Sequence, residues 1–191
     1  MTTLILGLIL FLGVHSVRAI APGWRDRQRA RLGANGWKAL YSIASLAGFV
    51  LIVWGYGQTR AAPDLWTPPY WTRHLAALLM IPSFVLLVAA YVPRNRIKAA
   101  IGHPMVVGVK VWAFAHLLAN GRPGDVLLFG AFLAWAILAF IASRRRDRAA
   151  GTRYAAGTLT GDLLVAAIGL IAWAGFAFAG HRWLIGVGPF G

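Results

Sequence analysis

Residues 124–148 read GDVLLFGAFLAWAILAFIASRRRDR, an apolar block that ends in a run of arginines. Its apolar part, 124–143, has the length of about 20 residues that a helix needs to cross the hydrocarbon core of a bilayer. The block is too long and too continuous for a strand of a membrane barrel, which alternates polar and apolar residues over about ten positions. We therefore interpret it as a membrane-spanning helix that ends at the arginines.

Five further apolar blocks occur along the chain, separated by segments rich in proline, glycine and charged residues. They are residues 2–20, 38–57, 74–93, 104–120 and 161–180. Each is long enough, or nearly long enough, to span a bilayer as a helix. The sequence therefore predicts an all-α fold, a six-transmembrane-helix bundle that forms a single integral membrane domain over residues 1–191.

The first block resembles a secretory signal peptide in one respect. Ala19-Ile20-Ala21 has the pattern of small residues that marks a cleavage site. No positive charge precedes the apolar run, however, and Arg18 and Pro22 flank the site. We expect the first helix to be retained.

The composition excludes several classes of protein. Of the 191 residues, 59% are hydrophobic and 13% are charged, whereas a soluble domain is about half apolar and about a quarter charged. The positive charges behind the net charge of +14 lie between apolar blocks, which favours lipid headgroups over nucleic acid as their partner. The chain has no cysteine, which excludes disulfides, thiolate catalysis and iron–sulfur clusters. It also lacks the motifs of hydrolases, zinc proteases and phosphate-binding loops.

The positive charges predict the orientation of the helices. The first, third and fifth loops carry 14 of the 19 lysines and arginines, and the opposite side of the membrane carries 4. Because loops rich in Lys and Arg stay in the cytoplasm, we expect both termini on the outer, periplasmic side. The predicted location is the bacterial inner membrane, with several passes.

Four histidines fall at two depths of this predicted bundle. His15 and His103 share a cytoplasmic layer, and His74 and His116 share an outer layer. Two imidazoles that reach one depth from different helices can hold a haem iron between them. Alternatively, His15 forms a hydrogen bond between helices and His103 begins a helix at the interface.

A second group of candidates lies on the helix predicted over 104–120. Trp112, His116 and Asn120 follow one another at intervals of four residues and share a helix face, which lines either a cavity or a hydrogen-bond network. Lys110 lies within the apolar block, where a charged side chain needs a partner, water or an anionic ligand. Asp162 is one candidate partner, or else an acid that stabilises the first turn of its own helix.

Four segments together resemble the NnrU family, in the same order and over essentially the whole chain. They are FLGVHS (11–16), KALYS (38–42), GHPM (102–105) and AHLLANG (115–121). Proteins of this family are bacterial inner-membrane proteins linked with denitrification and nitric oxide metabolism. The family is related to 15-cis-zeta-carotene isomerase, an integral membrane enzyme that contains haem b.

The resemblance implies a haem b protein in which His15 and His103 are the axial ligands of the iron. It assigns His116 to the same site, and Arg18 lies where it can meet a haem propionate. The isomerase has been discussed with a cysteine ligand just before its His-Pro histidine, and Ala100 and Ile101 stand in that region here. The resemblance therefore implies haem binding more directly than it implies isomerase activity.

Besides a small transporter that would use Lys110 as an anion site, three functions remain open from the sequence. The first is redox-linked haem chemistry of the NnrU type, with nitric oxide as a possible ligand. The second is cis-trans isomerisation of a carotenoid-like polyene, and the third is a non-enzymatic role as an accessory factor of a nitric oxide or nitrite reductase. For an enzyme, the candidate catalytic residues are Lys110 and His116, with Trp112 beside them at the cofactor.

Overall fold

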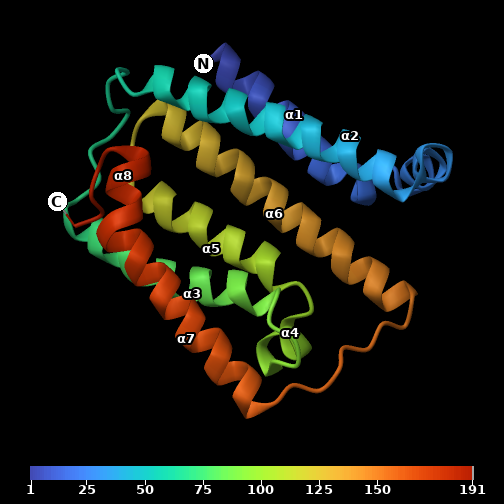
Figure 1. Ribbon diagram of the computed structural model, residues 1–191. Helices are drawn as coiled ribbons and strands as arrows, with labels where there is room; N and C mark the ends of the chain where they lie inside the picture. Colours follow the sequence, from blue (N-terminus) through green and yellow to red (C-terminus); the bar gives the residue numbers. More distant parts are fainter. Residues whose placement is uncertain (191) are drawn as a thin grey trace.

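The computed structural model describes residues 1–190, and most of them are helical (Figure 1). The helices are α1 (Thr2–Ile20), α2 (Pro22–Thr59), α3 (Trp71–Ala89), α4 (Arg96–Ile101), α5 (Pro104–Ala119), α6 (Pro123–Ala149), α7 (Leu159–Gly175), the π-helical turn η1 (Phe176–Gly180) and α8 (His181–Ile185). Residues 1–190 form no strand and contain one isolated bridge, between Asn95 and Thr158. The prediction of an all-α fold is confirmed.

Within the described residues, five helical stretches are long and apolar enough to cross a membrane. They are α1, α2, α3, α6 and the continuous run from α7 to α8. α5 is apolar but has 16 residues, about 24 Å at 1.5 Å per residue, whereas the hydrocarbon core is about 30 Å thick. The predicted block 104–120 thus corresponds to a helix that is shorter than the core.

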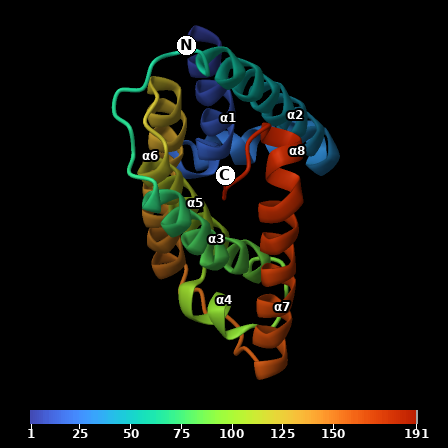
Figure 2. The same cartoon turned by 90° about the vertical axis from the view of Figure 1, so that its left-hand side faces the viewer.

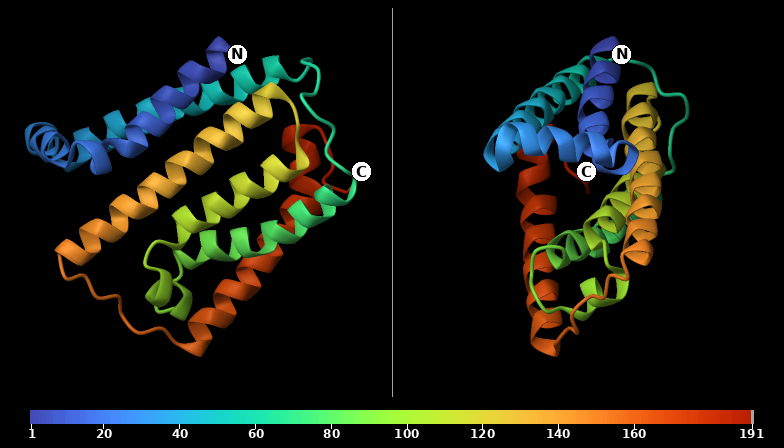
Figure 3. Two further views of the ribbon diagram at one scale, coloured as in Figure 1. Left: turned by 180° about the vertical axis from the view of Figure 1, so that it is seen from behind. Right: turned by 90° about the vertical axis from the view of Figure 1, so that its right-hand side faces the viewer.

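The helices form a curved layer in which neighbours pack in the order α2, α1, α6, α5, α3 and α7. Figures 2 and 3 show this curve from three sides, with α8 near the end of α2. A hydrogen bond from the Arg60 guanidinium to the carbonyl of Ile185 joins those two helices. Both termini lie at the same end of the bundle (Figure 1).

Small residues bring α1 and α2 together. A Cβ atom added to Gly55 would lie 2.3 Å from the backbone nitrogen of Leu4, and one added to Gly48 would lie 2.8 Å from that of Phe11. The two backbones therefore approach as closely as glycine alone permits. Such contacts provide packing where apolar side chains gain little from leaving lipid.

The first predicted loop is wrong in its local structure, because residues 22–37 are helical except at Gly33. α2 begins at Pro22, a position where proline is favoured because its missing N–H would have no helical partner. The change of direction occurs at Gly33, with φ 70° and ψ 168°, a conformation that glycine adopts without steric cost. Asn35 and Gly36 form a pair that is typical of turns, but both residues lie within α2.

Two further loops are also partly helical. α4 occupies the third loop, and the side chain of Asn95 caps it by accepting a hydrogen bond of 2.6 Å from the backbone of Lys98. α6 continues through the arginine run to Ala149, because arginine is a good helix former and water solvates its charge beyond the membrane. This extension carries Asp147, which takes part in the site described below.

Candidate functional site

His15 is held in one tautomer within the bundle. Its Nδ1 lies 2.7 Å from the carbonyl oxygen of Phe11, one turn earlier in α1. Because a carbonyl can only accept, Nδ1 carries the proton and Nε2 of the neutral ring carries a lone pair. A hydrogen bond that fixes Nδ1 in this way is the usual arrangement of a metal-ligating histidine.

Aromatic rings surround the His15 imidazole on three sides. Phe11 stacks on it with the ring centroids 4.2 Å apart. Tyr41 of α2 and Trp135 of α6 meet it edge-on, at 5.4 Å and 6.2 Å. His15 therefore lies where α1, α2 and α6 meet.

The buried Nε1 atom of Trp135, which contacts His15, has no hydrogen-bond partner among residues 1–190. Leaving such a group unpaired costs about 1–3 kcal/mol, so it calls for an explanation. Ser45 lies one helical turn from Tyr41 on α2. We name His15, Tyr41, Ser45 and Trp135 the His15 cluster.

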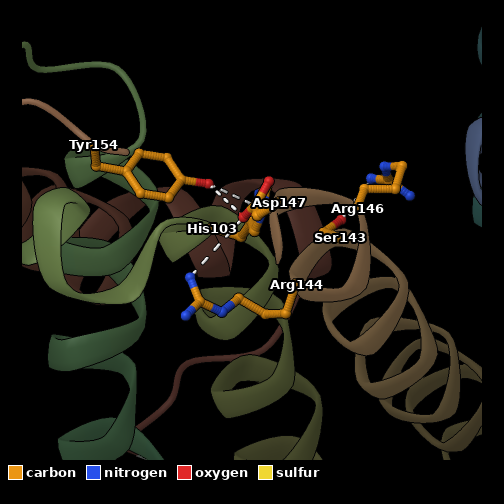
Figure 4. Close-up of polar contacts among 6 residues, drawn as sticks. All are labelled: His103, Ser143, Arg144, Arg146, Asp147 and Tyr154. Atoms are coloured by element: carbon orange, nitrogen blue, oxygen red, sulfur yellow. Dashed lines mark hydrogen bonds and ion pairs between the residues drawn. The ribbon is translucent and has the colours of Figure 1, made fainter. Parts of the chain in front are cut away.

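His103 takes part in a different group, at the cytoplasmic end of α6 in the predicted orientation (Figure 4). Its Nε2 donates to Oδ2 of Asp147 at 2.8 Å. The hydroxyl of Tyr154 donates to the same oxygen at 2.7 Å and lies 3.2 Å from the His103 nitrogen. We name these three residues the surface triad.

The backbone beside His103 is adapted to this contact. Gly102 has φ +79°, and a Cβ atom there would lie 2.8 Å from the Tyr154 ring. Both the dihedral angle and the available space thus require glycine at this position. The GH pair of the GHPM segment therefore positions the imidazole against Asp147.

The surface triad lies in the charged part of α6, beyond its apolar stretch. The hydrogen bond from Tyr154, with further contributions from His103 and Arg144, lowers the pKa of Asp147 below its ordinary value, despite partial burial. Burial and the Asp147 carboxylate raise the pKa of Tyr154. Asp147 is therefore an ionised acceptor at neutral pH, and Tyr154 is a neutral donor.

The structure does not bring His15 and His103 together. His15 contacts α6 at Trp135 and His103 contacts it at Asp147, positions about 18 Å apart along the helix axis. The Nε2 atom of His103 is also engaged by the carboxylate. Of the two histidines, only His15 therefore has a ring nitrogen that no other side chain engages within residues 1–190. The pairing of His15 with His103 stays a prediction of the resemblance.

His116 lies in the outer half of the predicted bundle, against the aromatic core. Its Nδ1 donates to the carbonyl of Trp112 at 2.8 Å, and its ring lies 4.7 Å from that of Phe129. Asn120 donates to the carbonyl of His116 at 2.8 Å. The predicted stripe of Trp112, His116 and Asn120 is thus linked by hydrogen bonds along a single helix.

A chain of rings joins the two histidine positions. Phe132 of α6 lies 5.9 Å from Phe11, which stacks on His15, and 5.3 Å from Trp112, which packs on His116. The aromatic core is therefore continuous from one half of the bundle to the other.

The carboxylates have structural partners. Asp125 is 4% exposed, accepts a hydrogen bond of 2.6 Å from Tyr56 and caps α6. Asp162 accepts from the backbone nitrogen of Arg96 at 2.7 Å and pairs with its guanidinium at 3.7 Å. The alternative in which Asp162 pairs with Lys110 is therefore not the arrangement observed.

Lys110 has no hydrogen bond or ion pair within the described residues. Its Nζ lies 4.0 Å from the centre of the Phe140 ring, a cation–π contact that partly compensates for the loss of water. Arg18 lies in the last turn of α1, and within residues 1–190 it forms no hydrogen bond with the surface triad or the His15 cluster. No group of three or more His or Asp side chains within residues 1–190 is arranged to hold a metal ion.

Sequence reasoning missed four members of these sites: Ser45, Trp135, Asp147 and Tyr154. Ser45 and Trp135 look like ordinary residues of an apolar helix in the sequence, and the missing hydrogen-bond partner of Trp135 is visible only in the packed structure. Asp147 carries one signal, because it is an acidic residue within a run of arginines.

Several apolar helices with polar clusters between them define a multi-pass membrane protein. The family model described as NnrU protein matches residues 3–189, nearly the whole chain. The chain therefore belongs to the NnrU family. No curated protein and no solved structure matches it.

Proposed function

We propose that this NnrU protein spans the bacterial inner membrane six times, with both termini in the periplasm. The five long apolar stretches and the shorter α5 run in alternating directions, and the two termini lie at one end of the bundle (Figure 1). α5 completes the series if the bilayer thins locally around it, which short spans tolerate at modest cost. The excess of Lys and Arg in the odd-numbered loops supports the orientation.

Within this frame, the protein acts as a haem b protein with redox-linked chemistry in nitric oxide metabolism. The observation that carries the proposal is the state of His15, with Nδ1 fixed by the carbonyl of Phe11 and Nε2 without a hydrogen-bond partner among residues 1–190. His15 would hold the iron, and Arg18, three residues later in α1, would offer a cation to a propionate. Haem bound there would supply electron transfer and the binding of small ligands such as nitric oxide.

The chain's own residues would control that site in three ways. Phe11, Tyr41 and Trp135 exclude water from the imidazole. Lys110, Trp112 and His116 remain the candidates for contact with a substrate deeper in the bundle. For His103 to become the second ligand, its imidazole would have to leave Asp147 and approach α1.

An absorption spectrum of the purified, full-length protein tests this proposal. A Soret band that shifts on reduction is expected, and H15A should lose most of the haem. H74A is the matched control, because His74 contacts the ring of Tyr70 and should keep its haem. Full haem content in both H15A and H103A would overturn the ligand assignment.

The second candidate function is haem-dependent isomerisation of a polyene. An apolar groove of about 340 Å³ between α1 and α6 supports it, because such a groove accepts a long hydrocarbon. Incubation of the haem-loaded protein with a cis-polyene in lipid vesicles, followed by product analysis, distinguishes this function from electron transfer.

A further inference from the structure

The first part of α2 is a helical segment with a direction of its own. Residues 22–32 are helical, and the backbone breaks at Gly33 before α2 continues. Figure 1 shows this segment end-on and the right-hand view of Figure 3 shows it lengthwise, so it runs across the long axis of the bundle. In the proposed orientation it lies at the cytoplasmic end. A helix in this position runs along the membrane surface, at the level of the lipid headgroups.

The side of the segment that faces the bundle carries its bulky apolar residues. Trp24, Gln28 and Leu32 are four residues apart and therefore form one stripe. Gln28 is half-buried, which places the stripe toward the bundle and the membrane. Trp24 and Leu32 are nevertheless 45% and 47% exposed, so protein atoms leave them partly uncovered. Ala30 follows Gln28 by two residues, about 200° around the helix, and points to the cytoplasm.

Four arginines border this stripe. Arg25 and Arg29 lie on one flank, and Arg27 and Arg31 lie on the other. Arg25 pairs at 2.7 Å with Asp26, the only acidic residue of the segment. The other three arginines are exposed and form no ion pair within residues 1–190. The segment thus presents three unpaired guanidinium groups at the level of the headgroups.

The chemistry of this surface fits an anionic lipid. A stripe with Trp and Leu that is bordered by basic residues is typical of helices that lie in the membrane interface. Guanidinium groups bind phosphate strongly, and each basic side chain near an anionic membrane surface contributes about 1 kcal/mol. A soluble acidic protein would approach from the cytoplasm, where Asp26 and Ala30 lie, and would not meet the stripe.

We propose that residues 22–32 form an interfacial helix that binds anionic phospholipids of the cytoplasmic leaflet. Trp24 and Leu32 insert at the boundary between headgroups and acyl chains, and Arg27, Arg29 and Arg31 hold the lipid phosphates. The proposal rests on the proposed orientation for the choice of leaflet alone. It gives the first loop a role in lipid recognition, beyond its contribution to topology.

The test identifies the lipids that adjoin the segment in the full-length protein. The chain has no cysteine, so L32C carries a single bimane fluorophore on the stripe. The protein is placed in phosphatidylcholine nanodiscs that contain a nitroxide-labelled lipid, either phosphatidylglycerol or phosphatidylcholine. Half-maximal quenching should need about fivefold less phosphatidylglycerol, the effect of about 1 kcal/mol. Bimane at A30C, on the opposite side, should be quenched weakly by both lipids.

A triple variant tests the arginines. R27Q/R29Q/R31Q should need equal amounts of the two lipids for quenching. Continued quenching of L32C by both lipids shows that the segment of this variant keeps its place at the membrane.

R145Q/R148Q/R153Q is the matched control, because it removes the same charge from three exposed arginines in and after α6. It should keep the preference for phosphatidylglycerol. An equal loss of preference in both triple variants would contradict the proposal, because net charge would then be sufficient.

Two further results would overturn the proposal. One is equal quenching of L32C by the two lipids in the otherwise native protein. The other is quenching of L32C no stronger than that of A30C, as expected if water or an acidic protein adjoins the stripe. The two leaflets of a nanodisc have the same composition, so these results do not depend on the orientation. A reversed topology would move the lipid site to the other leaflet and leave it standing.

Discussion

At the scale of single residues, Asp147 connects the ends of two helices and a loop. Its carboxylate accepts from His103 and Tyr154 and lies 3.9 Å from the Arg144 guanidinium. The side chain is only 16% exposed, so water competes weakly for these contacts. We therefore expect the surface triad to stabilise the junction of α5 and α6.

D147N should lower the free energy of unfolding by about 1–2 kcal/mol, because a charge-assisted acceptor becomes a neutral amide. Denaturant unfolding of the protein in detergent micelles measures this change. D26N is the control, because Asp26 is 67% exposed and pairs only with Arg25. An equal loss of stability in both variants would show that the surface triad has no special role.

The contribution of Asp147 should also depend on pH. The Tyr154 hydrogen bond holds the pKa of Asp147 below 3.8 in the folded protein. A carboxyl group of this kind stabilises the fold above its unfolded pKa, and the contribution is lost as pH falls through the folded pKa. The stability difference between the native protein and D147N should therefore be constant near neutral pH and shrink below about pH 4.

At the scale of elements, the pair of α1 and α2 depends on backbone contact. Gly55 approaches the backbone of Leu4 and Gly7 approaches that of Ile52, closer than any Cβ atom permits. Because two backbones cannot rearrange as a flexible side chain can, the helices must separate if a methyl group is added. Separation would also disturb Tyr41 and Ser45, which α2 brings to the His15 cluster.

G55A should therefore destabilise the protein by about 1–3 kcal/mol, the usual cost of overpacking. G57A lies two residues further on in the same helix, where a Cβ atom meets nothing within 4 Å. It should leave stability unchanged or raise it slightly, because alanine favours helix more than glycine does. Thermal unfolding in detergent compares the two, and equal behaviour would contradict the importance of close backbone approach.

At the scale of the whole molecule, the proposed orientation makes the two faces chemically distinct. The chain has no cysteine, so a single introduced thiol reports its own location. D64C lies between α2 and α3, on the proposed periplasmic side, and R148C lies at the end of α6, on the proposed cytoplasmic side. A membrane-impermeant maleimide applied to intact spheroplasts should label D64C, and R148C should react only after lysis. The reverse pattern would invert the topology.

The sequence by itself determined the class of the protein. Long apolar blocks require helices in a bilayer because backbone N–H and C=O groups have no water to bind, and the blocks 2–20 and 104–120 match α1 and α5 to within one residue. Four short sequence segments were sufficient to identify the family to which the chain belongs. The hydropathy of a block and the residues of a short segment depend only on neighbours in the sequence. They can therefore be recognised without knowing which residues are in contact in the folded protein.

Only the tertiary structure decided which side chains share a site. Counting residues along the helices placed His15 and His103 in one layer, but they contact α6 at Trp135 and at Asp147, about 18 Å apart along its axis. The contacts of His103 with Asp147 and Tyr154, and the contact of His15 with Trp135, join residues 44 to 120 positions apart in the sequence. Such groupings depend on the order in which helices pack, and that order is set by close contacts such as those of Gly7, Gly48 and Gly55.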